Sequence, residues 1–130
     1  MVRIVIVTHG RLASELAATA RLIFGTLEGV HEVNLPPDRD IDDMKAELAG
    51  IMESAAGGSV VLLTDMFGGS AFMAAAPYAR APDRMLVAGV NLPLFLDLLQ
   101  ARETEDIEGL KKTVEANKER YLVLFKEPAK

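Results

Sequence analysis

Cysteine and tryptophan are absent from this chain of 130 residues. The lack of cysteine excludes a disulfide framework, a thiol nucleophile, a thiolate metal site and thiol redox chemistry. It also suits a reducing compartment.

Long hydrophobic runs are missing as well. The first apolar run, Ile4 to Val7, is shorter than the roughly 7 to 15 residues of a signal-peptide core. The stretch from Ser59 to Ala76 contains Asp65 and Gly68-Gly69, whereas a membrane-spanning helix needs about 20 apolar residues. We therefore expect a soluble cytoplasmic protein that does not insert into a membrane.

The sequence also has no cluster of basic residues. The chain has 14 Lys and Arg residues against 19 Asp and Glu residues, a formal net charge of -5. Nucleic acid is not an expected partner, because phosphate backbones favour clustered positive charge. The composition, 50% hydrophobic and 25% charged, is that of a globular protein with a real core. We expect one domain over residues 1–130.

Apolar periodicity predicts four strands that alternate with helices. Ser70 and Asn91 are candidate helix caps, and Gly25 is placed to close the first helix. The tail from Tyr121 to Phe125 either extends the last helix or forms a fifth strand, and its β-branched and aromatic residues favour a strand. The predicted strands are 2–7, 30–35, 60–63 and 84–90, and the predicted helices are 11–24, 41–54, 70–79, 92–102 and 107–118.

This alternation predicts an α/β fold with a single doubly wound, mostly parallel sheet and helices on both faces. Ligands of such sheets gather beyond the carboxyl ends of the strands, where neighbouring connections leave in opposite directions. His9 follows the first strand and Asp65 follows the third. In the common strand order 2-1-3-4 these strands are neighbours about 4.8 Å apart, so the two side chains can meet.

A histidine paired with a carboxylate is suited to nucleophilic chemistry. The carboxylate, here Asp65, accepts the proton on one ring nitrogen of His9 and leaves the other nitrogen unprotonated and nucleophilic. The glycines of Phe67-Gly68-Gly69-Ser70 let backbone N–H groups point outward ahead of a helix N-terminus that favours anions, and Gly10 gives similar access before the first helix. A phosphoryl group fits this arrangement.

Structural interpretations of the same residues remain open. His9 and Asp65 can each be packing or capping residues, and glycines after a strand can serve the turn alone. Ser70 and Asn91 are helix caps first, although Asn91 lies on the same edge of the sheet and can close over the site. Arg11 can contact a phosphoryl group or a partner, or can simply be solvated, and we assign His31 no function.

Several enzyme motifs are missing. A nucleophile elbow around Ser70 would need glycine where Phe72 stands. No phosphate-binding loop of the G-x-x-x-x-G-K-[ST] type occurs, and no G-x-G-x-x-G follows the first strand. His9 and His31 are separated by a whole helix, so no metal site is expected and no cofactor is implied.

Three segments together resemble a known family. They are Ile4-Val-Ile-Val-Thr-His9-Gly10, Leu63-Thr-Asp65-Met-Phe-Gly-Gly-Ser70 and Ala88-Gly-Val-Asn91-Leu-Pro93. The chain resembles, over nearly its whole length, the mannose-family IIA component (EIIA of the mannose/fructose/sorbose type) of the bacterial phosphoenolpyruvate-dependent sugar phosphotransferase system, the PTS.

The resemblance implies a phosphotransferase component that carries a phosphoryl group on histidine. His9 would accept it from the phosphohistidine of HPr and pass it to a IIB component for sugar uptake by membrane IIC and IID components. Asp65 matches the aspartate that hydrogen-bonds this histidine. Family members are homodimers that exchange an antiparallel edge strand, for which residues 121–125 are the candidate. Because the chain ends at Lys130, the IIB partner is expected to be a separate polypeptide.

The sequence departs from the family pattern after Gly68-Gly69-Ser70. Ala71, Phe72 and Met73 stand where the family usually has Pro-Phe-Asn. The missing proline removes rigidity at the helix start, and the missing asparagine removes a polar group near the phosphoryl site or the docking surface. Partner choice is therefore open, while His9 and Asp65, on which the chemistry depends, are both present.

Two other functions compete with the transport carrier. One is a regulatory phosphoprotein of a PTS without a permease, in which the same His9 chemistry gates binding to another protein. The other is a receiver-like domain phosphorylated on Asp65, although receivers hold a metal with acidic residues where this chain has Thr8-His9. The sequence names no sugar, because that specificity would belong to the membrane partners.

Overall fold

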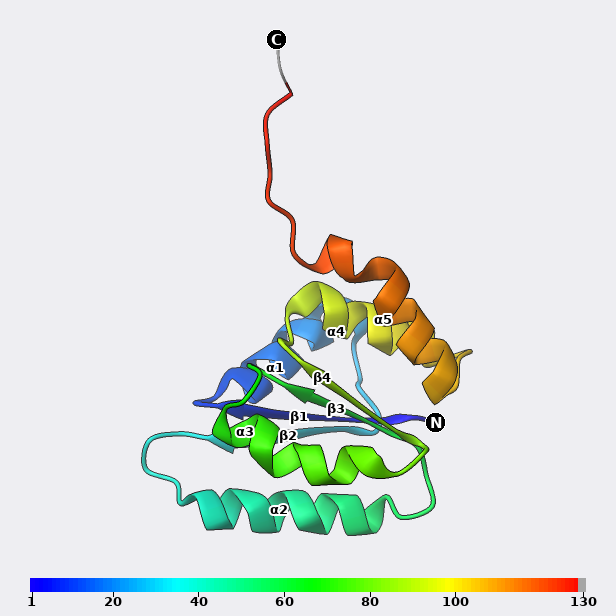
Figure 1. Ribbon diagram of the computed structural model, residues 1–130. Helices are drawn as coiled ribbons and strands as arrows, with labels where there is room; N and C mark the ends of the chain where they lie inside the picture. Colours follow the sequence, from blue (N-terminus) through cyan, green and yellow to red (C-terminus); the bar gives the residue numbers. More distant parts are fainter. Residues whose placement is uncertain (129–130) are drawn as a thin grey trace.

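The computed structural model describes residues 1–128 and places a four-stranded parallel sheet between two layers of helices (Figure 1). The strands are β1 (Arg3–His9), β2 (Val30–Leu35), β3 (Val60–Thr64) and β4 (Arg84–Ala88). The helices are α1 (Leu12–Phe24), α2 (Ile41–Ser54), α3 (Ser70–Ala75), the 3-10 helix η1 (Ala76–Arg80), α4 (Leu92–Ala101) and α5 (Ile107–Tyr121).

The strand order is β2-β1-β3-β4 and every pairing is parallel, which confirms the predicted fold. In register, Val7 of β1 lies beside Thr64 of β3. The carboxyl ends of these two central strands therefore meet at one edge of the sheet.

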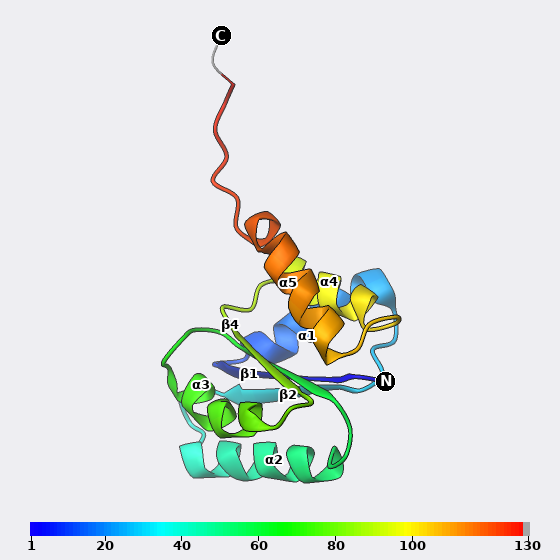
Figure 2. The same ribbon diagram turned by 45° about the vertical axis from the view of Figure 1, so that its right-hand side comes forward.

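Alternating residues of the central strands feed two separate cores. Ile4, Ile6 and Leu63 pack beneath α1, α4 and α5, whereas Val5 and Leu62 pack beneath α2 and α3. Figures 1 and 2 show these two helical layers on opposite faces of the sheet. Because β1 and β3 are buried on both faces, their sequences read as continuous apolar runs.

The third predicted helix is interrupted. The helix α3 ends at Ala75 and continues as η1, because Pro77 has no N–H to extend the α-helical ladder. The predicted cap Ser70 is the first helical residue instead, and Gly69 holds the cap position without a side-chain bond, so that prediction was wrong. By contrast, Asn91 does cap α4 and Gly25 does follow α1.

The end of the chain leaves the body of the protein. Tyr121 is the last residue of α5, and residues 122–128 form neither helix nor strand in the single chain and project outward (Figures 1 and 2). An exchanged strand would form only against a second chain, so that assignment stays a prediction. Among residues 1–128, no helix is long and apolar enough to cross a membrane.

Candidate functional site

The candidate site lies at the carboxyl ends of β1 and β3. The connection after β1 leads to α1 on one face of the sheet, and the connection after β3 leads to α3 on the other face (Figure 1). This is the switch point at which open parallel sheets bind ligands. His9 is the last residue of β1, and Asp65 directly follows β3.

The structure brings His9 and Asp65 into the predicted contact. Asp65 Oδ2 lies 2.8 Å from His9 Nδ1, and the same oxygen accepts the backbone N–H of His9 at 3.1 Å. The His9 side chain is 43% exposed, against 15% for Asp65. With Nδ1 donating to the carboxylate, Nε2 has no hydrogen-bond partner among the described residues and keeps its lone pair. The arrangement is that of an oriented nucleophile.

The glycines after Asp65 make room for this imidazole. Gly68 has φ +81°, a left-handed conformation that favours glycine. A Cβ on Gly69 would lie 2.9 Å from His9 Cε1, a distance that real Cβ atoms do not show. The backbone of the turn can therefore approach the histidine ring closely only because residue 69 has no side chain.

The two helix N-termini near the site differ in their free N–H groups. In α1, Thr8 Oγ1 accepts the N–H of Ala13 at 2.8 Å and Asn34 Oδ1 accepts that of Ser14 at 3.3 Å. Gly10 N–H donates to Leu35 O at 2.8 Å. The N–H groups of Gly10, Ala13 and Ser14 are therefore already bonded, whereas those of Arg11 and Leu12 have no acceptor within residues 1–128. That the start of α1 helps to bind an anion stays a prediction.

The start of α3 keeps its donors. Within residues 1–128, the N–H groups of Ser70, Ala71 and Phe72 have no acceptor, and the first bond of this turn runs from Met73 N–H to Gly69 O. Polar donors are thus available on the side of the site that follows Asp65.

Of the remaining predicted residues, Asn91 has a structural role, whereas Arg11 and Phe67 are exposed. Asn91 Oδ1 accepts the N–H of Leu94 at 3.0 Å, and its Nδ2 donates to the carbonyl of Tyr121 at 2.9 Å, so both ends of the amide are occupied. Arg11 is exposed at the cap position of α1. Phe67 is exposed and its ring packs against Phe72 with centroids 4.8 Å apart.

The second histidine has a different environment. Desolvation by burial, together with the nearby positive charge of Arg3, lowers the pKa of His31 below its ordinary value. His31 lies on the outer strand β2 beside Val5. It is away from the switch point, in agreement with the absence of an assigned role.

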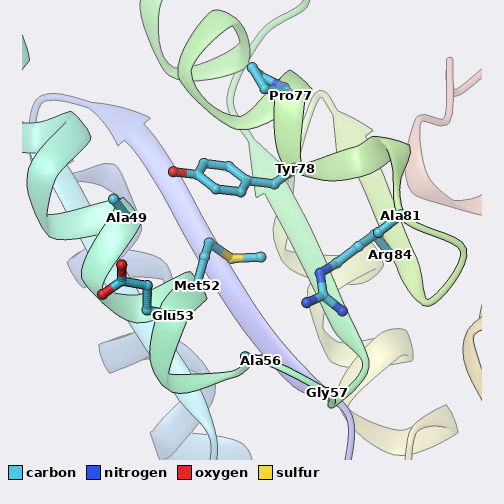
Figure 3. A pocket seen from close by; sticks show the side chains of 9 residues that line it. All are labelled: Ala49, Met52, Glu53, Ala56, Gly57, Pro77, Tyr78, Ala81 and Arg84. Carbon is cyan, nitrogen blue, oxygen red and sulfur yellow. The ribbon is translucent and has the colours of Figure 1, made fainter.

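A separate groove of about 570 Å³ lies between α2 and η1. Figure 3 shows Tyr78 and Met52 along its walls, with Glu53 and Arg84 near its ends. Arg84 already donates to Gly58 O and pairs with Asp83. The groove contains neither His9 nor Asp65, so it is not the site of the histidine chemistry.

Sequence reasoning missed two site-supporting residues, Thr8 and Asn34. Thr8 lies near the end of the buried strand β1, Asn34 lies near the end of the outer, partly buried strand β2, and both bond to the first turn of α1. For Thr8, a polar residue at the end of an apolar run shortly before a helix was the available signal. The partner of Asn34, however, lies 20 residues away in the chain.

Comparisons with known proteins point to one family. The family model described as PTS system fructose IIA component matches residues 3–115. The PTS system mannose-specific EIIAB component of Escherichia coli (strain K12) is 32% identical over 109 residues, 80% of this chain and 33% of that protein. The PTS system fructose-specific EIIA component of Bacillus subtilis (strain 168) is 30% identical over 121 residues, 89% of this chain and 81% of that protein.

A solved structure shares the fold. The mannose/sorbose specific IIA subunit from Enterococcus faecalis superposes with a TM-score of 0.84 at 23% identity, over 98% of this chain and 96% of that one. The chain spans about a third of the length of the E. coli relative.

Proposed function

Because this chain belongs to the family of PTS IIA components of the mannose and fructose type, we propose that it carries a phosphoryl group on His9. The observation that supports this role is the pairing of His9 Nδ1 with Asp65 at 2.8 Å, which leaves Nε2 free on a partly exposed side chain. IIA components of the PTS are phosphotransferase proteins. In this proposal residues 1–130 form one such domain.

The proposed step is a transfer between two histidines. Nε2 of His9 attacks the phosphorus of the phosphohistidine of HPr, and the donor N–P bond breaks as the new N–P bond forms. The donor ring, which carries a proton on its other nitrogen, leaves as neutral imidazole with the electron pair of the broken bond, and the positive charge passes to the ring of His9. The proton on His9 Nδ1 stays in its bond to Asp65, so no net proton transfer is required.

Asp65 is the proposed positioning residue. Its Oδ2 binds both the ring and the backbone of His9, which fixes the tautomer and the direction of the ring. Its negative charge also stabilises the ring as positive charge develops during the attack. The transferred phosphoryl group would then lie near Phe67, Gly68, Gly69 and Ser70, where free N–H groups can bind its oxygens.

The proposed partners follow from the family. HPr is the donor, and a IIB component is the acceptor that leads to sugar uptake through membrane IIC and IID components. All steps would take place in the cytoplasm. The exposed Phe67, on the turn that follows Asp65, supports docking at this edge of the sheet, because a protein donor must bring its own histidine into contact with Nε2.

We also propose that two copies of the chain form a dimer. The outer edge of β4 has no neighbouring strand within the described residues. A groove beside it is lined by Val87, Val114 and Leu122, and the apolar residues that follow Tyr121 are largely exposed. A tail from a second copy, paired antiparallel with β4, would cover both surfaces.

Phosphorylation with purified components tests the carrier role. The protein and a His9→Ala variant are incubated with phosphoenolpyruvate, Enzyme I and HPr, and intact mass and acid lability are measured. We expect one acid-labile phosphoryl group on the wild type and none on the variant. Label retained by His9→Ala would identify another acceptor, and acid-stable, base-labile label would indicate Asp65.

A further inference from the structure

The six methionines of the chain divide into a buried and an exposed set. Met44, Met52 and Met85 are at most 6% exposed and belong to the two cores. Met66 and Met73 are 55% and 62% exposed, and Met1 is exposed at the start of the chain. The exposed internal methionines therefore both lie on the segment that follows Asp65.

Met66 and the imidazole of His9 both lie close to the backbone of Gly69. An ideal Cβ on Gly69 would be 2.9 Å from His9 Cε1, 3.1 Å from Met66 Cγ and 3.6 Å from Met66 Sδ. The imidazole and the thioether thus flank the same point, and Cε1 is the ring carbon next to Nε2. Met73 lies one turn into α3, and its side chain is not among the three atoms nearest to that point.

Sulfur chemistry in this chain is confined to methionine, because cysteine is absent. Hydrogen peroxide transfers one oxygen atom to a thioether: the O–O bond breaks, sulfur loses two electrons, and water is released. The product, methionine sulfoxide, has a polar oxygen with partial negative charge. Exposed methionines react before buried ones, so Met66 is open to this reaction.

We propose that Met66 is an oxidation site that controls phosphoryl uptake by His9, an inference that rests on the proposed carrier function. A sulfoxide oxygen beside Cε1 repels the negatively charged phosphoryl group as it approaches Nε2. The larger side chain also crowds the ring against the backbone of Gly69, where there is no spare space. Methionine sulfoxide reductases remove the oxygen and restore the thioether.

The test uses dilute peroxide on the full chain, with Met66→Leu and with Met73→Leu as the matched control. Peptide mass spectrometry locates each sulfoxide, and phosphoryl uptake from phospho-HPr is timed for each protein against its own untreated sample. We expect uptake by the wild type and by Met73→Leu to slow roughly three- to tenfold, and uptake by Met66→Leu to keep its rate. The two sulfoxide reductases together should restore the wild-type rate.

A second readout does not depend on HPr. The NMR signal of the His9 Cε1 proton should move when Met66 is oxidised and stay in place in oxidised Met66→Leu. Slowing of Met66→Leu to the same extent as the wild type would overturn the inference. So would an unchanged uptake rate in wild type that has Met66 fully oxidised. An untreated wild type that takes up no phosphoryl group would instead overturn the proposed function, and the inference with it.

Discussion

At the residue scale, the proposed chemistry depends on one imidazole nitrogen that remains free. Asp65 Oδ2 holds Nδ1 and the backbone N–H of His9, while Asp65 Oδ1 is buried and has no partner among the described residues. One oxygen of the carboxylate therefore makes both bonds that position the ring. Replacement of this residue changes the nucleophile without removing an apolar contact of the core.

Asp65→Asn is expected to slow phosphoryl uptake by His9 roughly 10- to 100-fold, because the ring loses the charged acceptor that fixes its tautomer. Transfer from phospho-HPr, quenched at a series of times, measures the rate, and thermal unfolding shows whether the fold is kept. Asp38→Asn is the matched control, since Asp38 is exposed. Transfer by Asp65→Asn at the wild-type rate would reject the positioning role.

Gly69→Ala is expected to slow the same reaction, because its Cβ would lie 2.9 Å from His9 Cε1 and the ring must shift. A Cβ on Gly50, within the exposed face of α2, meets nothing within 4 Å. Gly50→Ala should therefore leave transfer unchanged and raise the free energy of unfolding by about 0.5–1 kcal/mol. Equal transfer rates in the two variants would show that the backbone at residue 69 can move away.

At the scale of elements, the apolar pattern of the sequence predicts the strands and helices whose apolar residues are buried. Strands β1 and β3 are apolar runs because both faces are covered, and the buried residues of α1 and α2 recur along one face of each helix, so these elements are predictable from sequence. Pro77 also carries a local signal for the end of α3 that the sequence analysis did not use. Hydrogen bonds between residues far apart in the chain leave no such pattern in the sequence.

The candidate site shows the same limit. His9 and Asp65 are predictable together, since both follow buried strands that become neighbours in the sheet. The hydrogen bond of Gly10 was not predictable, because its N–H donates to the carbonyl of Leu35, which lies 25 residues later on another strand. Whether the N–H after a strand stays free is thus decided by tertiary contacts and not by the presence of glycine.

Asn91 links two elements, the start of α4 and the end of α5. Burial, with Asp97 as hydrogen-bond acceptor and neighbouring charge, raises the pKa of Tyr121, so its hydroxyl stays protonated and donates to Asp97. Asn117 Nδ2 donates to the same carboxylate at 3.0 Å. Together with the bond from Asn91 to the Tyr121 carbonyl, these contacts fix the point at which the tail leaves the body.

Asn91→Ala is expected to lower the free energy of unfolding by roughly 1–2 kcal/mol, since it removes the cap of α4 and the bond to Tyr121. Asn91→Ser keeps a capping oxygen but lacks the amide donor, so it should lose less stability. Urea unfolding of the two variants separates the contributions. Equal stability of Asn91→Ala and wild type would show that neither the cap of α4 nor the bond to Tyr121 contributes measurably.

At the scale of the whole molecule, the sheet has two edges that differ in their surroundings. Within residues 1–128, both β2 and β4 pair with another strand on one side only. Beyond β4, the groove lined by Val87 and Leu122 adjoins the start of the tail, where Leu122 to Phe125 are 70–85% exposed. Four consecutive exposed apolar residues that begin at this groove support the proposed dimer, in which a second chain would cover them.

Proline substitutions in the tail test this proposed strand exchange. Successive N–H groups of a strand point to opposite sides, so Val123→Pro and Leu124→Pro between them remove a donor from whichever side faces β4. We expect at least one of them to weaken the dimer roughly tenfold in sedimentation equilibrium, because the pairing loses a ladder hydrogen bond and an extended conformation is restricted before the proline. Deletion of residues 122–130 should weaken it further.

The fold of the single chain is not expected to lose stability, because these side chains are exposed and residues 122–128 pair with no strand in one chain. Thermal unfolding of the monomeric fraction should therefore match that of Glu127→Ala, a control beyond the apolar segment. A dimer that persists unchanged in both proline variants and in the deletion would place the interface elsewhere. The exposed apolar tail would then need another cover, since a free segment of this composition beside an open strand edge favours association between chains.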